Sequence, residues 1–184
     1  MTDALMTKTR TMGHESYGIL VEPATLRLER LLPGPIERIW RYLTESDLRR
    51  QWLAAGDMDL VANAPFELVW RNDELSAETK GRPEGFPEED RMESRIIEID
   101  PPRKLVFAWR KGGEVSWELT PQGRDVLFTI THHRISDRAN MVKVGAGWHM
   151  HLDTLVARAN GSVPSPFWDG WLRLREEYEA RLPG

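Results

Sequence analysis

Cysteine is absent from the 184 residues of this chain. Without a thiol the protein has no disulfide, cysteine nucleophile, zinc–thiolate site or iron–sulfur cluster, and this usage fits a reducing compartment. Long hydrophobic runs are also missing, since no stretch approaches the roughly 18 apolar residues of a membrane span. Residues 1–13 lack the apolar middle of a signal peptide. We therefore expect a cytoplasmic protein with no membrane span.

Neither sign of charge is in large excess. The 25 Lys and Arg residues stand against 29 Asp and Glu residues, and the formal net charge of -4 weighs against a nucleic-acid partner. Hydrophobic residues make up 40% of the chain and charged residues 29%, which are ordinary values for a folded domain. Residues 1–16 carry little hydrophobic pattern, so we expect a flexible leader there and a single domain over residues 17–184.

Alternating apolar and polar residues predict a sheet with one apolar face. Residues 25–32 form the first alternating run. Four later runs occupy residues 66–70, 105–109, 115–119 and 126–130. Short turn sequences among them predict an antiparallel meander. The connection over residues 72–90 is different, because it is long and rich in Glu, Gly and Pro, which is typical of a functional lid or a mobile segment.

Helical spacing of apolar residues predicts four helices. Two short ones are expected over residues 36–43 and 44–52, the second with Ser46 as its cap. An apolar stripe over residues 137–160 predicts a long helix of about six turns. A last helix follows residue 166, and its apolar side would dock on this domain or form a homodimer contact.

The order of these elements predicts an α+β fold of the helix-grip type. Only the apolar face of the sheet is large enough to cover the long C-terminal helix, so we expect the antiparallel sheet to curve around that helix. The two short helices follow the first strand and would lie at an end or edge of the sheet. The extra terminal helix completes the predicted architecture.

Three sequence segments stand in an order that resembles a known superfamily. They are RLLPGPIERIW at residues 30–40, IDPPRKLVFAW at residues 99–109 and GWHMHL at residues 147–152. Together with the strand meander, they resemble the START-like SRPBCC superfamily, whose helix-grip fold is also that of the birch-pollen allergen. Within it the chain is most similar to bacterial homologues of the activator of heat-shock protein 90 ATPase. The similarity runs from about residue 17 to residue 182.

The resemblance implies an incomplete barrel around a long helix, with a cavity that in many relatives holds a hydrophobic ligand. It does not imply one activity, because the superfamily includes lipid carriers, hormone receptors, aromatase/cyclases and co-chaperone domains. In the eukaryotic co-chaperone the similar part is the C-terminal domain only. A chaperone partner and a role in the stress response are therefore expectations that come from the resemblance alone.

Large aromatic side chains are the most informative candidates for a ligand site. The indoles of the strands fall on the apolar face, and that of the long helix falls on its inner stripe. The candidate ligand-binding residues are Trp70, Phe107, Trp109, Trp117, Phe128, His132, Trp148 and His149. These rings would either line a cavity for flat apolar ligands or fill the interior as a solid core.

His132 is the candidate polar group of this site. It follows the apolar residues of its strand at the strand period, so its ring should share their face. A buried imidazole there would anchor a ligand, act as the acid or base of a cyclase-like enzyme, or simply bond to the backbone at the strand end. No other catalytic residue is predicted, because the usual hydrolase, kinase and dehydrogenase motifs are missing.

A metal site is not predicted. His149 and His151 are two residues apart, and on a helix this spacing turns their side chains about 200 degrees away from each other. Either ring would reach the cavity rim, and the periodicity does not choose between them. No spacing of the His-Glu-x-x-His type is present, and we expect no cofactor.

The sequence thus predicts a protein that binds a small hydrophobic or aromatic molecule between the long helix and the sheet. Residues 72–90 would gate that cavity. The alternatives are a cyclase/aromatase-like enzyme that uses His132 and a chaperone-interaction module that uses its surface. The identity of the ligand is not predicted.

Overall fold

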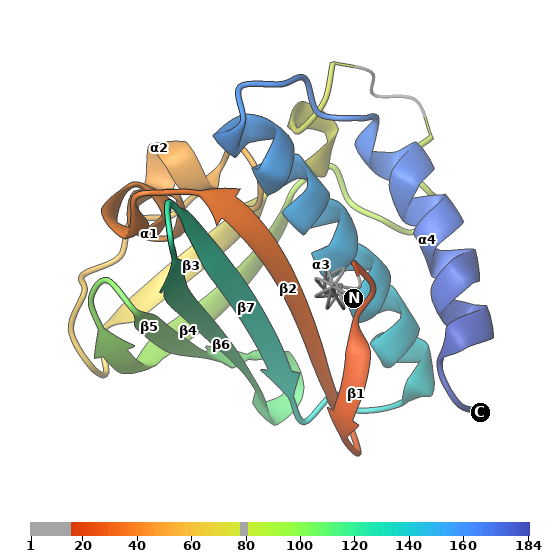
Figure 1. Ribbon diagram of the computed structural model, residues 1–184. Coiled ribbons are helices and arrows are strands. Elements are labelled where there is room, and N and C mark those ends of the chain that lie inside the picture. The colour runs from red at the N-terminus through yellow and green to blue at the C-terminus, as the bar shows by residue number, and fades with distance from the viewer. Residues whose placement is uncertain (1–15, 78–80) are drawn as a thin grey trace, which may run out of the picture.

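A single antiparallel sheet organises the structure. A computed structural model describes residues 16–77 and 81–184, so residues 1–15 of the expected leader lie outside the described part. Seven strands in the described residues follow the order β1-β2-β7-β6-β5-β4-β3. They are β1 (Ile19–Glu22), β2 (Thr25–Pro33), β3 (Pro65–Trp70), β4 (Asp90–Asp100), β5 (Lys104–Trp109), β6 (Gly113–Gln122) and β7 (Asp125–His133). Strand β2 therefore pairs with β7, the last strand of the meander, and β1 lies outside β2 at the edge of the sheet (Figure 1).

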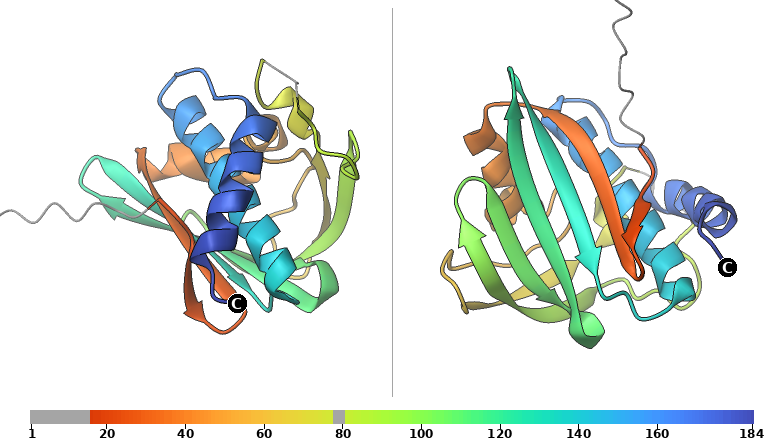
Figure 2. Two further views of the ribbon diagram at one scale, coloured as in Figure 1. Left: turned by 90° about the vertical axis from the view of Figure 1, so that its right-hand side faces the viewer. Right: turned by 60° about the horizontal axis from the view of Figure 1, so that its bottom comes forward.

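The helices cover the concave side of this sheet. In the described residues the α-helices are α1 (Ile36–Thr44), α2 (Ser46–Arg49), α3 (Arg138–Ala159) and α4 (Phe167–Arg181). The short 3-10 helices are η1 (Asn72–Glu74) and η2 (Arg110–Gly112). The long α3 crosses the concave face, α4 runs beside α3, and α1 and α2 lie at one end of the sheet (Figures 1 and 2). The predicted α+β helix-grip architecture is confirmed.

The main core lies between the sheet and α3, as the strand pattern predicts. Alternate residues of β6 face inward, and Trp117 stands between Leu105 of β5 and Ile130 of β7 in the register of the sheet. All three side chains are fully buried. Trp148 and Leu152 of α3 pack onto the same cluster. Burial of an indole or a leucine removes apolar surface from water at about 25 cal/mol per Å², so this layer is what holds the helix on the sheet.

A second apolar cluster lies on the opposite side of α3, against α4. Met150 of α3 and Trp171, Leu174 and Tyr178 of α4 belong to it. The two helices approach closely at Gly145, where a Cβ atom would lie only 3.0 Å from the Tyr178 ring. Helix α3 is therefore buried on both sides, and α4 docks on its own chain.

Two strands and one cap differ from the sequence-based predictions. Strands β1 and β4 are not among the alternating runs that predicted the sheet, and in β4 only Met92 and Ile96 of the eleven residues are buried. The register of β4 also shifts between Ile96 and Glu98, which interrupts the alternation. Helix α2 is shorter than residues 44–52, and Ser46 does not cap it. The Ser46 hydroxyl instead accepts the backbone N–H of Gly56 at 2.9 Å.

No helix within residues 16–77 and 81–184 combines the length and the apolar character needed to cross a bilayer.

Candidate functional site

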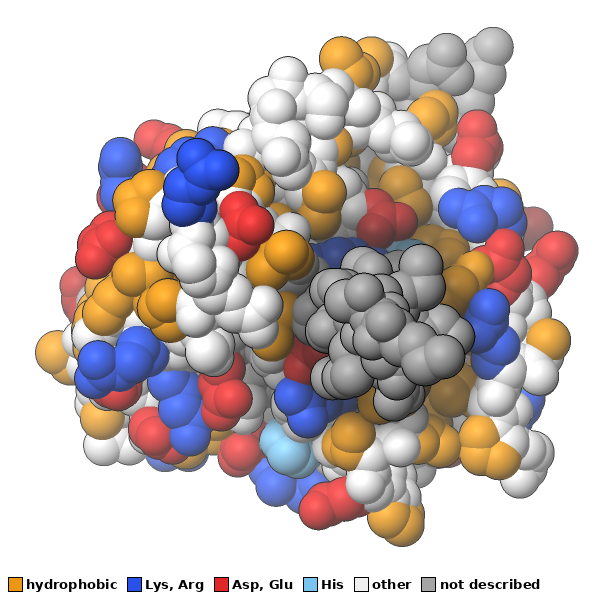
Figure 3. Space-filling model, viewed as in Figure 1, with side chains coloured by type: hydrophobic (Ala, Val, Ile, Leu, Met, Phe, Trp, Pro, Cys, Tyr) orange, Lys and Arg blue, Asp and Glu red, His pale blue; other side chains and the backbone are white. Residues whose placement is uncertain are grey.

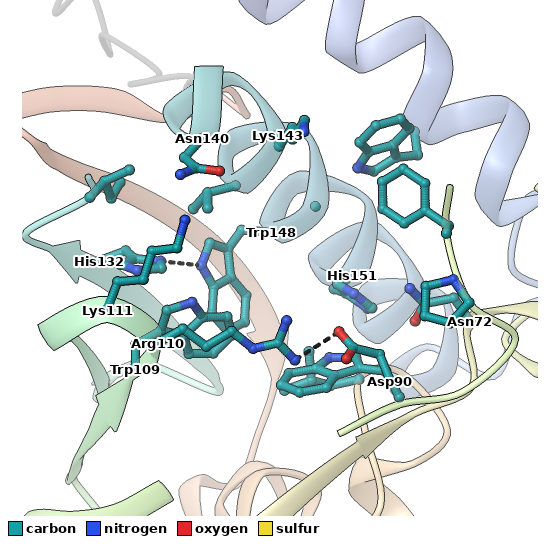
Figure 4. A pocket seen from close by; sticks show the side chains of 18 of the residues that line it. Asn72, Asp90, Trp109, Arg110, Lys111, His132, Asn140, Lys143, Trp148 and His151 are labelled. Atoms are coloured by element: carbon teal, nitrogen blue, oxygen red, sulfur yellow. Dashed lines mark hydrogen bonds and ion pairs between the residues drawn. The ribbon is translucent and has the colours of Figure 1, made fainter. Parts of the chain in front are cut away.

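A cavity of about 360 Å³ opens beside the middle of α3. One wall comes from the ends of strands β3, β5 and β7, and another from α3 and the first turns of α4. The connection between β3 and β4 forms the third side through Asn72 and residues 86–88. The cavity lies at the edge of the interface between helix and sheet, where the two layers separate (Figure 4). Residues 78–80 of the connection are not described.

Aromatic rings form two groups in the lining of the cavity. Trp109 is central, because its ring centroid lies 5.7 Å from that of Trp70, 5.5 Å from that of Trp148 and 5.0 Å from that of His132. On the α4 side, the Phe86 ring lies 5.0 Å from the Trp171 ring at 71°. These tilted and edge-on arrangements are those that aromatic pairs prefer. One group of rings therefore lines the cavity on the side of the sheet and the other on the side of α4.

The eight predicted ligand-binding residues divide into two groups. Four of them line the cavity, namely Trp70, Trp109, His132 and Trp148. The other four lie outside its lining, namely Phe107, Trp117, Phe128 and His149. The predicted alternatives of solid core and cavity therefore apply to different rings, since the deeper ones fill the interior.

Trp117 shows why the deeper rings do not reach the cavity. Its side chain is fully buried and its ring centroid lies 4.9 Å from that of Phe107 and 5.8 Å from that of Trp52. Among the described residues its indole N–H has no hydrogen-bond partner. Trp117 thus packs as core between the sheet and the segment that follows α2.

His149 faces α4 instead of the cavity. Its Nδ1 lies 3.1 Å from the Tyr178 hydroxyl, and its Nε2 lies 3.5 Å from a carboxylate oxygen of Asp153. Burial lowers the pKa of His149 to about 4, although the Asp153 carboxylate acts in the opposite direction. This placement makes His149 part of the contact between the two long helices.

The geometry of His132 defines its tautomer. The Trp148 indole N–H can only donate, and it donates to His132 Nδ1 at 3.1 Å. The imidazole proton is therefore on Nε2. Burial lowers the pKa of His132 to about 4, and the nearby His133 adds to this effect. At neutral pH His132 presents one N–H donor and no charge to the cavity.

His151 also lines the cavity, and its tautomer is the opposite one. Its Nδ1 lies 2.8 Å from the carbonyl oxygen of Trp52, which can only accept, so Nδ1 carries the proton and Nε2 is an acceptor. Burial lowers the pKa of His151 to about 4. Asn72 also lines the cavity, and its buried Oδ1 has no partner among the described residues. The two imidazoles therefore offer one donor and one acceptor to the cavity.

Several cavity residues were missed by the sequence-based prediction. These residues are Asn72, Phe86, Phe167, Trp168 and Trp171, whereas His151 is one of the two rings between which helical periodicity did not choose. Three of them come from the start of α4, whose position on α3 no periodicity reveals. Phe86 did carry a signal, because it is one of the few large apolar residues between residues 72 and 90. Its ring anchors that connection against Trp168 and Trp171.

Arrangements suited to a metal ion are not found in the part of the chain that the structure describes. There, no three His, Cys, Asp or Glu side chains come together in a group that could bind one. His149 and His151 point to opposite sides of α3, toward Tyr178 and Trp52 respectively.

A sheet that grips a long helix, with an aromatic cavity where they separate, defines a START-like protein of the SRPBCC superfamily. The family described as "Activator of Hsp90 ATPase homolog 1-like protein" matches residues 33–160. The chain belongs to this family. A comparison with curated proteins gave no match.

Solved structures support this assignment. A protein encoded by gene BPP1335 from Bordetella parapertussis is 36% identical, with 92% of each chain covered and a TM-score of 0.78. CalU16 from Micromonospora echinospora is 23% identical, with coverage of 85% of this chain and 86% of that one and a TM-score of 0.63. DynU16, from the dynemicin biosynthetic locus, is 16% identical over 79% of this chain and 50% of that chain, with a TM-score of 0.62. The last two show similarity of fold alone.

Proposed function

We propose that this protein binds a small hydrophobic or aromatic molecule in the cavity between α3, α4 and the sheet. The aromatic cavity itself carries the proposal: its volume of about 360 Å³ falls within the range of about 300 to 1,000 Å³ that is usual for ligand pockets. Aromatic rings line it from two sides, and the charged side chains of the lining lie at its rim. This combination favours a flat apolar body over a sugar or a nucleotide.

The polar groups of the cavity would orient such a ligand. His132 Nε2 supplies a donor suited to a ligand carbonyl or ether oxygen. His151 Nε2 supplies an acceptor suited to a hydroxyl or an amine. No other hydrogen bond to these two ring nitrogens is found among the described residues, so a ligand that bonds to them would satisfy polar groups of the cavity wall.

The lowered pKa of His132 and the hydrogen bond at its Nδ1 favour ligand binding over proton-transfer catalysis. A general base works best when its pKa lies near the working pH, whereas burial lowers the pKa of His132 to about 4. The Nδ1 lone pair is already used by the Trp148 N–H. A cyclase-like reaction at this imidazole would therefore depend on a weak base.

The family description names an activator of Hsp90 ATPase, and it makes a chaperone-related role the second candidate. That role concerns the outer surface and does not need the cavity. Co-purification of the chain with the host's heat-shock protein 90 would support it, and absence of enrichment would count against it.

A cavity-filling substitution tests the proposed function. Gly147 lies on α3 in the cavity lining, and a Cβ atom there would meet nothing closer than Trp171 Nε1 at 4.0 Å. We expect Gly147→Phe to place its ring in the cavity and to weaken binding of the fluorescent probe N-phenyl-1-naphthylamine at least about tenfold. The helix should be retained, because glycine is the poorer helix former by about 0.5 kcal/mol or more.

Gly147→Ala is the matched control, since its methyl group leaves the cavity open. Probe fluorescence, the tryptophan emission and the shift in melting temperature are measured for all three proteins. The wild type and Gly147→Ala should bind the probe alike. Equal binding by Gly147→Phe, or no binding by the wild type of this probe or of a panel of aromatic compounds and fatty acids, would contradict the proposal.

A further inference from the structure

We infer that the ligand is an anionic amphiphile, whose apolar body enters the aromatic cavity and whose single acidic group is bound at the mouth by Lys111 and Lys143. This inference rests on the proposed function and adds the charge of the ligand to it. The inference comes from a difference between the basic residues of the cavity rim: the arginines have carboxylate partners, whereas the lysines do not.

The rim of the cavity is basic in a chain that is acidic as a whole. Four basic side chains and two acidic ones line it, namely Arg110, Lys111, Arg134, Lys143, Glu88 and Asp90. The formal charge of the entire chain is -4. An excess of two positive charges is thus gathered around an apolar opening. Elsewhere, on the face seen in Figure 3, basic and acidic side chains are intermixed.

The two arginines of the rim already have carboxylate partners. Arg110 donates to Asp90 at 2.7 Å and lies over the Trp70 ring. Arg134 forms an ion pair with Glu114 at 3.3 Å. Neither arginine therefore needs a ligand to neutralise its charge.

The two lysines are different. Among residues 16–77 and 81–184, neither Lys111 nor Lys143 forms an ion pair or a side-chain hydrogen bond. The charge of Lys111 contributes to lowering the pKa of the Asp137 carboxyl group. However, Asp137 is occupied as the cap of α3, where it accepts the Asn140 backbone N–H at 2.8 Å. Two ammonium groups at the cavity are thus available to an incoming anion.

Lys111 occupies a backbone position that does not favour lysine. It lies in η2, between β5 and β6, with a φ of 57° in the left-handed region. Glycine or asparagine adopts this conformation more readily than residues with longer side chains. The backbone conformation of the turn therefore does not explain a lysine at this position. A role of the Lys111 ammonium group at the cavity would explain it.

Lys143 reaches the same end of the cavity from the opposite wall. It lies on α3 one turn before Gly147, and both residues line the cavity. In Figure 4, Lys111, Asn140 and Lys143 lie toward the start of α3, whereas Asp90 and Asn72 lie at the other end. The positive charge is therefore concentrated at one end. An acidic group there remains partly hydrated, because both lysines are exposed, and its apolar body can extend toward Trp148.

A pair of probes with the same aromatic body tests the charge of the ligand. The dye 8-anilino-1-naphthalenesulfonate carries one sulfonate, and N-phenyl-1-naphthylamine is the same molecule without it. We expect the wild type to bind the sulfonate about tenfold more tightly, since each partly exposed ion pair contributes about threefold. This preference should decrease between 50 mM and 500 mM NaCl because salt screens exposed charges.

The double variant Lys111→Met, Lys143→Met should lose most of this preference, so that the ratio of the two affinities falls toward one. Lys104→Met is the matched control, because Lys104 is a lysine of β5 that pairs with Glu98 and lies outside the cavity lining. It should keep the preference. Gly147→Phe identifies the part of each signal that comes from the cavity.

The outcomes separate the two proposals. If the neutral probe binds in the cavity but the sulfonate binds no more tightly, or if the double variant keeps the wild-type ratio, the inferred anion is wrong while the proposed function stands. If Gly147→Phe changes the binding of neither probe, the cavity does not bind them, and both proposals are overturned.

Discussion

Replacement of Arg49 by methionine is expected to lower the free energy of unfolding by about 3 to 5 kcal/mol. The Arg49 side chain is fully buried, and its guanidinium donates to the carbonyl groups of Leu43, Thr44, Ala54 and Gly56. Burial lowers its pKa to about 10, with the Asp57 carboxylate opposing this effect, so the group stays charged at neutral pH. Methionine would fill much of the volume and leave all four carbonyl groups without this donor.

The effect of Arg49 should extend to the cavity. Its carbonyl partners lie in the segment that includes Trp52, whose indole N–H donates to the Tyr42 carbonyl at 2.9 Å. The Trp52 carbonyl in turn accepts from His151 Nδ1 at 2.8 Å and so orients a ring of the cavity. Loss of Arg49 would therefore loosen the wall that holds His151, and probe binding should weaken together with stability.

Urea unfolding at pH 7 measures the loss. Arg50→Met is the matched control, because Arg50 is exposed and forms only a 3.4 Å ion pair with Glu74; we expect a change within about 0.5 kcal/mol. The loss of unfolding free energy for Arg49→Lys should lie between those of the other two variants, since one ammonium group cannot replace a guanidinium group that donates to four carbonyl groups. A loss below about 1 kcal/mol for Arg49→Met would show that water satisfies these carbonyls instead.

Local periodicity was sufficient to predict most of the fold. The alternation is clearest in β6, where Val115, Trp117 and Leu119 are buried because one side of the strand meets the core. Strand β4 could not be recognised in this way. It lies near the edge of the sheet, most of its residues are exposed, and a register shift interrupts the alternation. The resemblance to the superfamily added the cavity, which periodicity alone does not reveal.

The candidate site was predicted less completely, because its walls depend on how α4 packs. Trp148 and His132 follow from the pattern of their own helix and strand. Trp168 and Trp171 do not, since their place in the cavity depends on a tertiary contact between helices. His149 and His151 were equivalent by helical geometry, and only the packing distinguishes them: α4 covers one, and the segment of Trp52 covers the other.

Acidification from pH 7 to pH 5 is expected to lower the free energy of unfolding by about 4 kcal/mol through two buried histidines. Burial lowers the pKa of His132 and of His151 to about 4, whereas histidine in an unfolded chain has a pKa of about 6.5. Above pH 6.5 neither state binds a proton at these sites. As the pH falls from 6.5 toward 4, the unfolded chain binds protons that the folded protein excludes.

Each histidine contributes a slope of up to about 1.4 kcal/mol per pH unit in this window, or about 2 kcal/mol between pH 7 and pH 5. His149 acts in the same direction, because burial lowers its pKa to about 4 as well. The carboxylates with a lowered pKa, such as Asp137 and Glu177, lose their stabilising effect at lower pH. The interval from pH 6.5 to pH 5 is therefore dominated by the histidines.

Urea unfolding at pH 7, 6 and 5 tests this prediction. His132→Gln and His151→Gln will each lower stability at pH 7, since each removes a hydrogen bond of the native ring. Each should also reduce the slope against pH by about 1 kcal/mol per unit, which a merely structural effect would not do. An unchanged slope in the double variant of His132 and His151 would mean that both imidazoles become protonated in the folded protein. The cavity would then tolerate a charged imidazole, and the neutral donor and acceptor assigned to its walls would have to be abandoned.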